Sequence, residues 1–479
     1  MTSDKQSQSD SDGPGSQPVE TDGGTGVVSI KYKLNEKPPL LESIPFALQH
    51  VMFMIVINIT LAIIIANGIG LGTGGVSYIV QMAFLVAGIG TIVQALSFGG
   101  DFGFPVGGKL PIVMGTSAAF IGPLIIISQE FGIPAAFGAI IVAAPIEILL
   151  GYHVDKLESV FPPMLGGIVV TLIGLSLAPV AIDYFAGGAG ASDYGGLHHL
   201  GLGLLVMAVA LFFNQFFSGL MRSASVFLGL MAGYLTAIPL GLIDFTPVAN
   251  AEWFALPEVF PFGVSFDPVA ILTLLFMYII VMVETMGDVH GITEAEGRDP
   301  TESEMRGSLI ADGVMSAFAG MLGMFPNTSF SGNVGIVNYT GVMSRYVVGL
   351  GGVFLILMGL VPKVGALFTV TPPAVLGGAT IILFGMILAL GVRIITKAID
   401  LNLRNMIIVG MSLLVGLGVE IRPDAIGQLP QDVQTIFGSA LAAGTLIAIV
   451  LHAVLPEEPP FEIWLGQSAS EPAEVPADD

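Results

Sequence analysis

The sequence FMYIIVMVETMGD, residues 276–288, carries two carboxylates, Glu284 and Asp288, near the end of a membrane-length apolar run. A carboxylate inside hydrocarbon costs about 2.5–3.5 kcal/mol on insertion scales, so such a residue is a functional-site candidate by default. The two residues are four positions apart, and a helix therefore projects both from one face. We interpret them as the floor of a polar cavity within a bundle of membrane helices.

The composition extends this interpretation to the whole chain. Of the 479 residues, 53% are hydrophobic and 11% are charged, and the mean hydropathy is +0.86. About a quarter of the residues of a soluble protein are charged. Apolar runs of about 20 residues recur along the sequence, which indicates an all-α polytopic membrane protein of the transporter class. The chain has no cysteine, which excludes disulfides, thiolate metal sites and cysteine nucleophiles.

Polar tails flank the apolar part. Residues 1–37 are predicted to be a disordered acidic tail, residues 38–455 the transmembrane domain, and residues 456–479 an acidic, proline-rich tail. The formal net charge of −22 argues against a nucleic-acid partner. The sequence holds no metal-binding or cofactor motif in a fitting context, so we expect neither a metal nor a cofactor.

Hydrophobicity predicts fourteen transmembrane segments, and basic residues predict their orientation. With the N-terminus inside, nearly all lysines and arginines between the spans fall on the cytoplasmic side, as the positive-inside rule demands. Both termini are then cytoplasmic, in a multi-pass protein of the cell membrane. The spans lie near residues 43–66, 76–98, 109–127, 132–151, 161–182, 199–217, 224–243, 268–288, 307–325, 330–341, 346–368, 374–391, 405–419 and 435–455.

The chain also repeats itself weakly. The sequence PPMLGG at residues 162–167 is echoed by PPAVLGG at 372–378, and Thr116-Ser117 is echoed by Thr328-Ser329. Both echoes link spans seven apart, which predicts a seven-plus-seven inverted repeat with its site at the repeat interface. Spans 109–127 and 330–341 are interrupted by glycine or proline, so we expect each to be part extended and part helical, lining a cavity.

Several short motifs, taken in order, resemble the nucleobase–ascorbate transporter family, also called nucleobase–cation symporters or xanthine/uracil permeases. The similarity covers about residues 38–455. The motifs are Gln49-His50, Phe161-Pro-Pro, the segment 250–257, Glu284-Thr-Met-Gly-Asp288, Ala311-Asp312-Gly313 and the segment from Asn333 to Gly341 that contains Gly335 and Thr340.

This resemblance implies an architecture and an activity. Spans 1–4 and 8–11 would form a core, and spans 5–7 and 12–14 a gate, with the substrate between half-spans three and ten. The protein would import a nucleobase by cation symport through an elevator-like alternating-access mechanism. Its partners would be the nucleobase, H⁺ or Na⁺, membrane lipid and a second copy of the chain joined through the gates.

The resemblance also assigns residues. Glu284 matches the family's principal substrate carboxylate and Asp288 a neighbouring polar position, while His50 and Asp312 match positions coupled to transport. Asp288 is a candidate for ion coupling as well. Substrate contacts are also expected from the half-spans, at Ala118, Phe330, Ser331, Gly332 and Asn333. The simpler alternatives are that the aspartates only link helices, that His50 is a satisfied interior histidine, and that Phe330 and Phe120 are core rings.

Two positions depart from the family pattern, and they bear on the substrate. Gly332 stands where the family usually has Gln, Glu or Pro, and Ala118 where it often has Phe. If nothing else fills the space, the pocket is roomier than one built for a single ring. Together with Asp288, this favours a purine such as xanthine, urate or guanine over uracil.

Other functions and couplings remain open at this point. The alternative function within the transporter class is an anion carrier of the sulfate-transporter type, although a carboxylate-lined site disfavours anions. The alternative from a different functional class is an intramembrane enzyme that uses Glu284, Asp288 and Asp312. Glu, Asp and His can relay protons, which favours H⁺ coupling, but the same carboxylates could hold Na⁺.

Overall fold

The computed structural model describes residues 30–100, 103–154, 162–398 and 402–456. Of the tails predicted at residues 1–37 and 456–479, residues 1–29 and 457–479 lie outside this range. Residues 30–37 are described, and the Lys31 amide donates to the Gly341 carbonyl at 2.8 Å, so the predicted disorder does not extend to this part of the tail. The longer helices are α1 (Leu40–Gly68), α2 (Thr73–Leu96), α3 (Ile121–Phe131), α4 (Ile133–Ala143), α7 (Pro163–Ser176), α9 (Leu197–Phe216), α11 (Ser225–Ala237), α13 (Pro268–Glu294), α14 (Glu302–Met321), α15 (Ser331–Thr340), α16 (Arg345–Gly359), α18 (Pro373–Ala398), α19 (Leu403–Ile421) and α21 (Ala440–Val454). Shorter helices are α5 (Pro145–Gly151), α8 (Ala178–Phe185), α10 (Gly219–Ser223), α12 (Thr246–Asn250), α17 (Pro362–Thr369) and α20 (Gln431–Phe437), with 3₁₀ turns η2 (Ala118–Phe120) and η3 (Pro423–Ile426).

The expected polytopic helical fold is present, with many of its helices interrupted. Within the described residues, eight helical segments are long and apolar enough to cross a membrane, or up to ten if each of two bent pairs is one span. The bent pairs are α16 with α17 and α20 with α21, each at an angle of 85°. The first bend falls at Pro362, which cannot donate the hydrogen bond that a continuous helix needs. The number fourteen stays a prediction.

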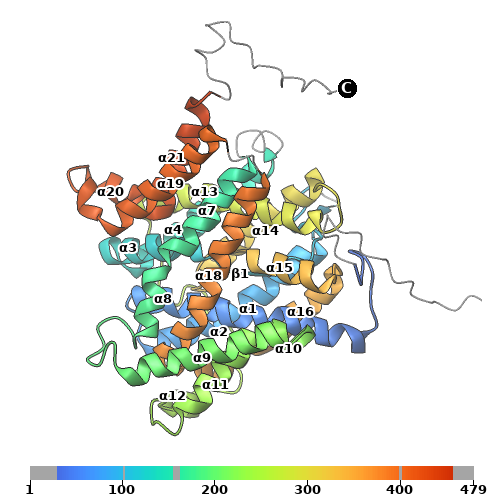
Figure 1. Ribbon diagram of the computed structural model, residues 1–479, viewed down its shortest axis with the longest axis vertical. Coiled ribbons are helices and arrows are strands. Elements are labelled where there is room, and N and C mark those ends of the chain that lie inside the picture. Colours follow the sequence, from blue (N-terminus) through green and yellow to red (C-terminus); the bar gives the residue numbers. More distant parts are fainter. Residues whose placement is uncertain (1–29, 101–102, 155–161, 399–401, 457–479) are drawn as a thin grey trace, which may run out of the picture.

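Two short strands lie among the helices (Figure 1). Strand β1 (Met114–Thr116) pairs antiparallel with β2 (Asn327–Ser329), and Gly115 is opposite Thr328. Strand β1 leads through η2 into α3, and β2 leads directly into α15. Each element is therefore part extended and part helical. The sequence predicts this for residues 109–127, whereas the second strand lies just before the predicted span 330–341. Because the strands pair with each other inside the protein, their backbone groups are satisfied without water.

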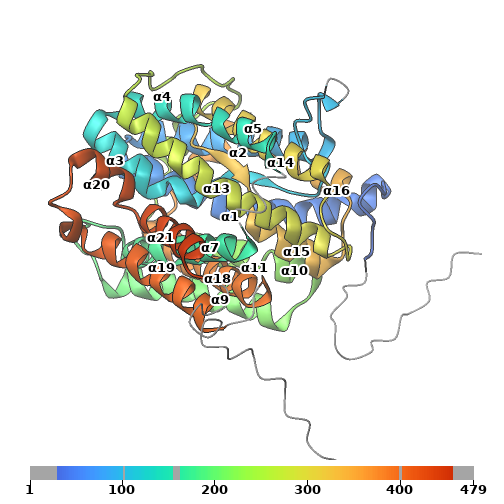
Figure 2. The same ribbon diagram turned by 90° about the horizontal axis from the view of Figure 1, so that it is seen from above.

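The helices form two groups, which Figure 2 shows on opposite sides of the molecule. The first group surrounds the strands and contains α1–α5 and α13–α17. The second group contains α7–α11 and α18–α21, in which α18 packs against α7, α8 and α9. Within the first group, α2 and α16 meet through Gly88 and Gly352, where a Cβ on either residue would lie 2.6–2.7 Å from the carbonyl oxygen of the other. Small residues permit such close packing of membrane helices.

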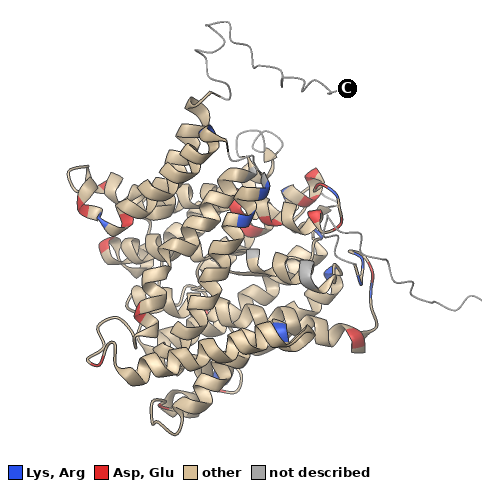
Figure 3. Cartoon of the chain, viewed as in Figure 1, with Lys and Arg blue, Asp and Glu red and all other residues tan. Residues whose placement is uncertain are grey.

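Charged side chains gather in loops and at helix ends, and the long helices are mostly uncharged (Figure 3). At one end, Arg298 pairs with Glu296 and Glu304 at 2.8 Å, just before α14 begins. These carboxylates raise the pKa of the Arg298 guanidinium further above its usual value. At the other end, the loop after α12 is fixed by Tyr78, whose hydroxyl accepts from the amide of Glu258 at 3.0 Å.

Candidate functional site

Asp312 on α14 ties the second strand to α13. Its carboxylate is fully buried and accepts hydrogen bonds from the Ser329 amide and the Ser329 hydroxyl, both at 3.0 Å. It accepts a third from the Thr285 hydroxyl at 2.6 Å. Three donors stabilise the negative charge of a buried carboxylate. Asp312 therefore holds β2 against the helix that carries Glu284 and Asp288.

His50 and Asn333 join α1 to α15. The Asn333 amide nitrogen donates to the Pro111 carbonyl at 2.6 Å, so its carbonyl oxygen is the atom that accepts from His50 Nδ1, also at 2.6 Å. Both side chains are buried. The structure thus brings these two predicted residues into direct contact, and it places the pair beside the segment that enters β1. A satisfied interior histidine and a transport residue are both consistent with this contact.

Asn58 is a site residue that the sequence analysis does not single out. It lies on α1, is buried, and accepts from the amide and the hydroxyl of Thr116 at 2.8 and 2.7 Å. Its amide nitrogen donates to the Ala83 carbonyl on α2 at 2.9 Å. The signal in the sequence that could have identified Asn58 is a single amide side chain within an apolar run. Asn58 holds β1 in the way that Asp312 holds β2.

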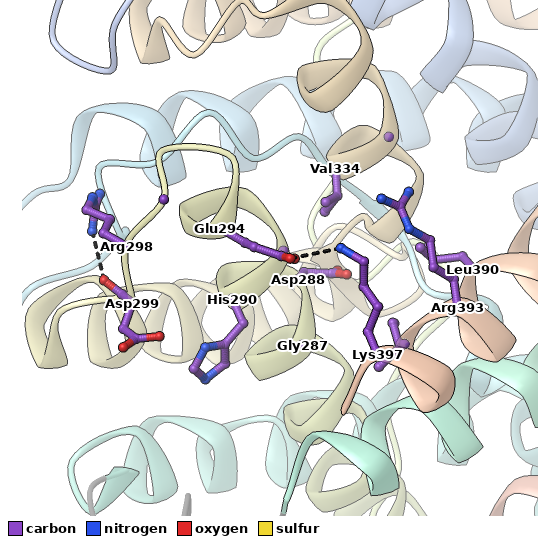
Figure 4. A pocket seen from close by; sticks show the side chains of 14 residues that line it. Gly287, Asp288, His290, Glu294, Arg298, Asp299, Val334, Leu390, Arg393 and Lys397 are labelled. Atoms are coloured by element: carbon purple, nitrogen blue, oxygen red, sulfur yellow. Dashed lines mark hydrogen bonds and ion pairs between the residues drawn. The ribbon is translucent and has the colours of Figure 1, made fainter. Parts of the chain in front are cut away.

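Asp288 faces a cavity of about 530 Å³, whereas Glu284 does not line it (Figure 4). Asp288 is buried and Glu284 is half-buried, one turn earlier on α13. The cavity lies between α13 and α15 of the first group and α18 of the second. Its lining residues are Gly287, Asp288, His290, Gly291, Glu294, Gly297, Arg298, Asp299, Val334, Gly335, Leu390, Arg393, Ile394 and Lys397.

Phe120 and Phe330, the two rings that could stack on a base, differ in their surroundings. Phe120 is fully buried, and its ring lies 4.7 Å from that of Tyr278, so it is a core ring in this structure. Phe330 is half-buried, and its ring lies 6.2 Å from that of Phe53 on α1. A Cβ at Gly332 would lie 2.7 Å from the Phe330 ring and 2.8 Å from the Phe53 ring. Rings therefore fill the space beside Gly332.

The remaining half-span candidates lie at the starts of the helices. Ala118 begins η2 and is half-buried. Ser331 begins α15, and its side chain is outside the described part of the structure. In neither η2 nor α15 does a described side chain cap the N-terminus. The first amides of a helix have no partner within the helix, so both N-termini can donate to a polar ligand.

Glu147 is a second buried residue that the sequence analysis does not single out. It lies on α5, within the predicted span 132–151, and its exposed fraction is 0%. Both of its carboxylate oxygens lack a hydrogen-bond partner among the described residues. It interacts electrostatically with Asp312 and Glu284. The rule that singled out Glu284, a carboxylate inside an apolar run, applies equally here.

Solved structures share the fold at low sequence identity. The transmembrane domain of a cyanobacterial bicarbonate transporter, BicA, matches 87% of this chain and 98% of its own, with a TM-score of 0.51 and 14% identity. The murine anion transporter Slc26a9, solved in an inward-facing state, matches 90% of this chain and 71% of its own, with a TM-score of 0.58 and 12% identity. At this identity, the likeness concerns the fold alone.

Sequence relatives are much closer. The uric acid permease PucK of Bacillus subtilis is 35% identical over 89% of this chain and 98% of its own. The uric acid transporter UacT of Escherichia coli is 35% identical over 85% and 84%, and a xanthine permease of B. subtilis is 33% identical over 86% and 93%. These relatives are permeases, which excludes the intramembrane-enzyme reading. Residues 41–425 also match the model of the permease family, and the chain therefore belongs to the permease family of xanthine and uric acid transporters.

Proposed function

We propose that this permease imports a nucleobase, with a purine favoured over uracil, by symport with a cation. The observation that carries the proposal is the meeting of β1 and β2, whose following helix N-termini lie against α13. A nucleobase is a flat, neutral ring that needs fixed donors, fixed acceptors and apolar faces. The helix amides supply donors, Glu284 and Asp288 supply acceptors, and Phe330 supplies an apolar face.

Purine specificity rests on the relatives and on Asp288. The relatives named above are permeases for uric acid and xanthine. Aromatic rings occupy the space beside Gly332, so the missing side chain there does not by itself enlarge the pocket. Asp288, at the wall of the cavity, is the residue that we expect to distinguish xanthine, urate or guanine from uracil. An anion carrier is the alternative function, and the paired carboxylates of α13 disfavour it.

We propose that the first helix group is the moving core and the second is the gate. This division follows spans 1–4 and 8–11 against spans 5–7 and 12–14 of a seven-plus-seven inverted repeat. The Thr-Ser echo supports the repeat, because its two copies fall at the paired strands. Substrate would cross the cell membrane as the core moves past the gate, with both termini cytoplasmic. Homodimerisation through the gates completes this proposal.

We propose protons as the coupling ion, with His50, Asp288 and Asp312 as candidate carriers. The cavity beside Asp288 is lined by Arg298, Arg393 and Lys397, which the positive-inside rule places on the cytoplasmic side. We therefore interpret it as a path from the site toward the cytoplasm. Na⁺ is the other candidate ion. Accumulation driven by a proton gradient in the absence of sodium distinguishes the two.

Glu284→Gln tests the binding site. The amide keeps the size of the side chain and loses the charge that strengthens hydrogen bonds from base N–H groups. Hydrogen bonds to charged groups contribute about 1.5–3 kcal/mol, so xanthine affinity should fall at least about tenfold. Calorimetry on purified protein measures it, with Glu252→Gln in the exposed loop as the control. Wild-type affinity in Glu284→Gln would refute the assignment.

A further inference from the structure

Glu147 is chemically isolated within the first helix group. It lies among apolar neighbours on α5, has an exposed fraction of 0%, and has no hydrogen-bond partner for either carboxylate oxygen among the described residues. A buried carboxylate without donors or a paired cation is so unfavourable that it neutralises instead. The residue therefore needs either a bound cation or a proton.

Its neighbours are acidic. Helix α5 packs closely on α14 next to Asp312, because a Cβ at Gly313 would lie 2.9 Å from the Ala144 carbonyl oxygen and 3.1 Å from the Ile148 amide nitrogen. Glu147 interacts electrostatically with Asp312 on α14 and with Glu284 on α13. Tyr278, also on α13, is a further titratable neighbour. Like charges so close cannot all persist in a buried site.

Arg306, the basic residue of α14, does not neutralise the charge of these carboxylates. Arg306 lies near Gly151 at the other end of α5, where it pairs with Glu302 and approaches the Tyr152 ring at 5.7 Å. No lysine, arginine or histidine within the described ranges forms an ion pair with Glu147 or Asp312. Helix α4, which also packs near α5, carries no titratable side chain between Ile133 and Ala143.

Asp312 and Glu147 differ in how many hydrogen bonds they accept, and this difference decides which of them holds a proton. Asp312 accepts from three donors, which stabilise its negative charge, whereas Glu147 accepts from none. When the pair holds one proton, the proton consequently rests on Glu147. A sodium ion shared by Glu147 with the carboxylates of Asp312 and Glu284 is the alternative occupant, and the transport experiment below distinguishes it from a proton.

We propose that Glu147 is an additional proton-binding site of the transporter, which takes a proton beside Asp312 and carries it with the core. This inference rests on the proposed proton symport. In each cycle one O–H bond forms on the Glu147 carboxylate from a proton of the aqueous phase on one side. The same bond breaks on the other side, and the proton returns to water. No other bond changes.

Glu147→Gln tests the proposal in proteoliposomes. The amide resembles the protonated carboxyl in shape and cannot release a proton. We expect exchange of labelled xanthine against unlabelled xanthine to continue, and uphill accumulation driven by a pH gradient to be lost. Glu147→Met, which is similar in volume and has no polar terminus, should give the same result if the amide disturbs folding. Glu252→Gln, an exposed carboxyl in the loop after α12, is the control.

Infrared difference spectroscopy gives a readout that does not depend on transport. A protonated carboxyl inside the protein has its own C=O stretching band, and we expect one such band to be absent from Glu147→Gln and present in Glu252→Gln. If wild-type protein shows this band but never accumulates substrate with a pH gradient, the symport proposal fails and proton binding at Glu147 stands. An unchanged band, full pH-driven accumulation in both Glu147 variants, or loss of a sodium-driven accumulation in them would overturn the assignment.

Discussion

Asn58→Ala should destabilise the protein through the loss of β1, because Asn58 is the side chain on α1 that fixes this strand. The substitution removes hydrogen bonds to the Thr116 amide, the Thr116 hydroxyl and the Ala83 carbonyl, all buried and at 2.7–2.9 Å. Neutral hydrogen bonds contribute about 1 kcal/mol each, so the three together give about 3 kcal/mol. The Thr116 donors left behind are buried, which adds the cost of an unsatisfied polar group.

Thr60→Ala is the matched control on the same helix. The Thr60 side chain is equally buried, but among the described residues its hydroxyl bonds only to the Val56 carbonyl of its own helix, at 2.7 Å. Its removal should cost about 1 kcal/mol or less and leave β1 in place. The two variants thus differ in whether the lost bonds connect separate elements.

Reversible unfolding in mixed micelles measures the free energy of unfolding, and calorimetry measures the affinity of the site for xanthine. We expect Asn58→Ala to lose about 3 kcal/mol and to bind weakly even where it remains folded. The Thr60 variant should bind as wild type does. If the two variants unfold within about 0.5 kcal/mol of each other and bind equally well, α1 does not position the strand through Asn58.

Two further perturbations test the surroundings of the site and the loop before α9. Gly332→Ala should alter the ranking of bases in competition against labelled xanthine, because its Cβ must displace the Phe330 or Phe53 ring. The control is Gly410→Ala on α19, which is exposed, does not line the cavity and leaves its Cβ in open space, so it should keep the ranking. Equal rankings in the two variants would refute this. Hydrogen bonds from His199 and His198 hold the pKa of Asp193 below its usual range, so its contribution to stability is present above about pH 4 and is lost as the pH falls through the lowered folded-state pKa. Wild type should therefore melt above Asp193→Asn at pH 5, and the two should converge as the pH falls below the lowered pKa of Asp193. A melting difference that persists below that pKa would contradict this origin.

The sequence predicted the carboxylates better than the elements that hold them. Glu284, Asp288 and Asp312 stand out because a charge inside an apolar run is costly wherever the run folds. Asn58 is less conspicuous, since an amide costs less, and its meaning depends on Thr116, which is 58 positions away. Glu147 satisfied the same rule as Glu284 but belonged to no recognised motif. Its lack of hydrogen bonds is visible only in the packed structure.

The spans were harder to predict than the site because hydrophobicity does not show where a helix breaks. Residues 346–368 form a single apolar run in the sequence, yet the structure divides them at Pro362 into two helices at 85°. Residues 435–455 overlap another bent pair. The mixed character of 109–127 was predictable, because glycine and proline mark interruptions that hydrocarbon would otherwise forbid. The predicted span 330–341 is helical instead, and its extended part lies just before it, at residues 327–329.

Three hydrogen-bonded side chains that hold the site lie within the first helix group, and this distribution bears on how the protein could move. Asn58 holds β1, Asp312 holds β2, and His50 holds α15 through Asn333, each by a buried bond. Polar side-chain contacts between the groups are more exposed: Lys397 with Glu294, Asn67 with Tyr184, and Glu130 with Gln431 and Thr435. An exposed ion pair contributes about 0–1 kcal/mol, whereas removing one partner of a buried polar contact costs about 1–3 kcal/mol. As far as these polar contacts are concerned, a movement that breaks those between the groups costs less than one that breaks those within the first group, which agrees with the elevator-like mechanism proposed above.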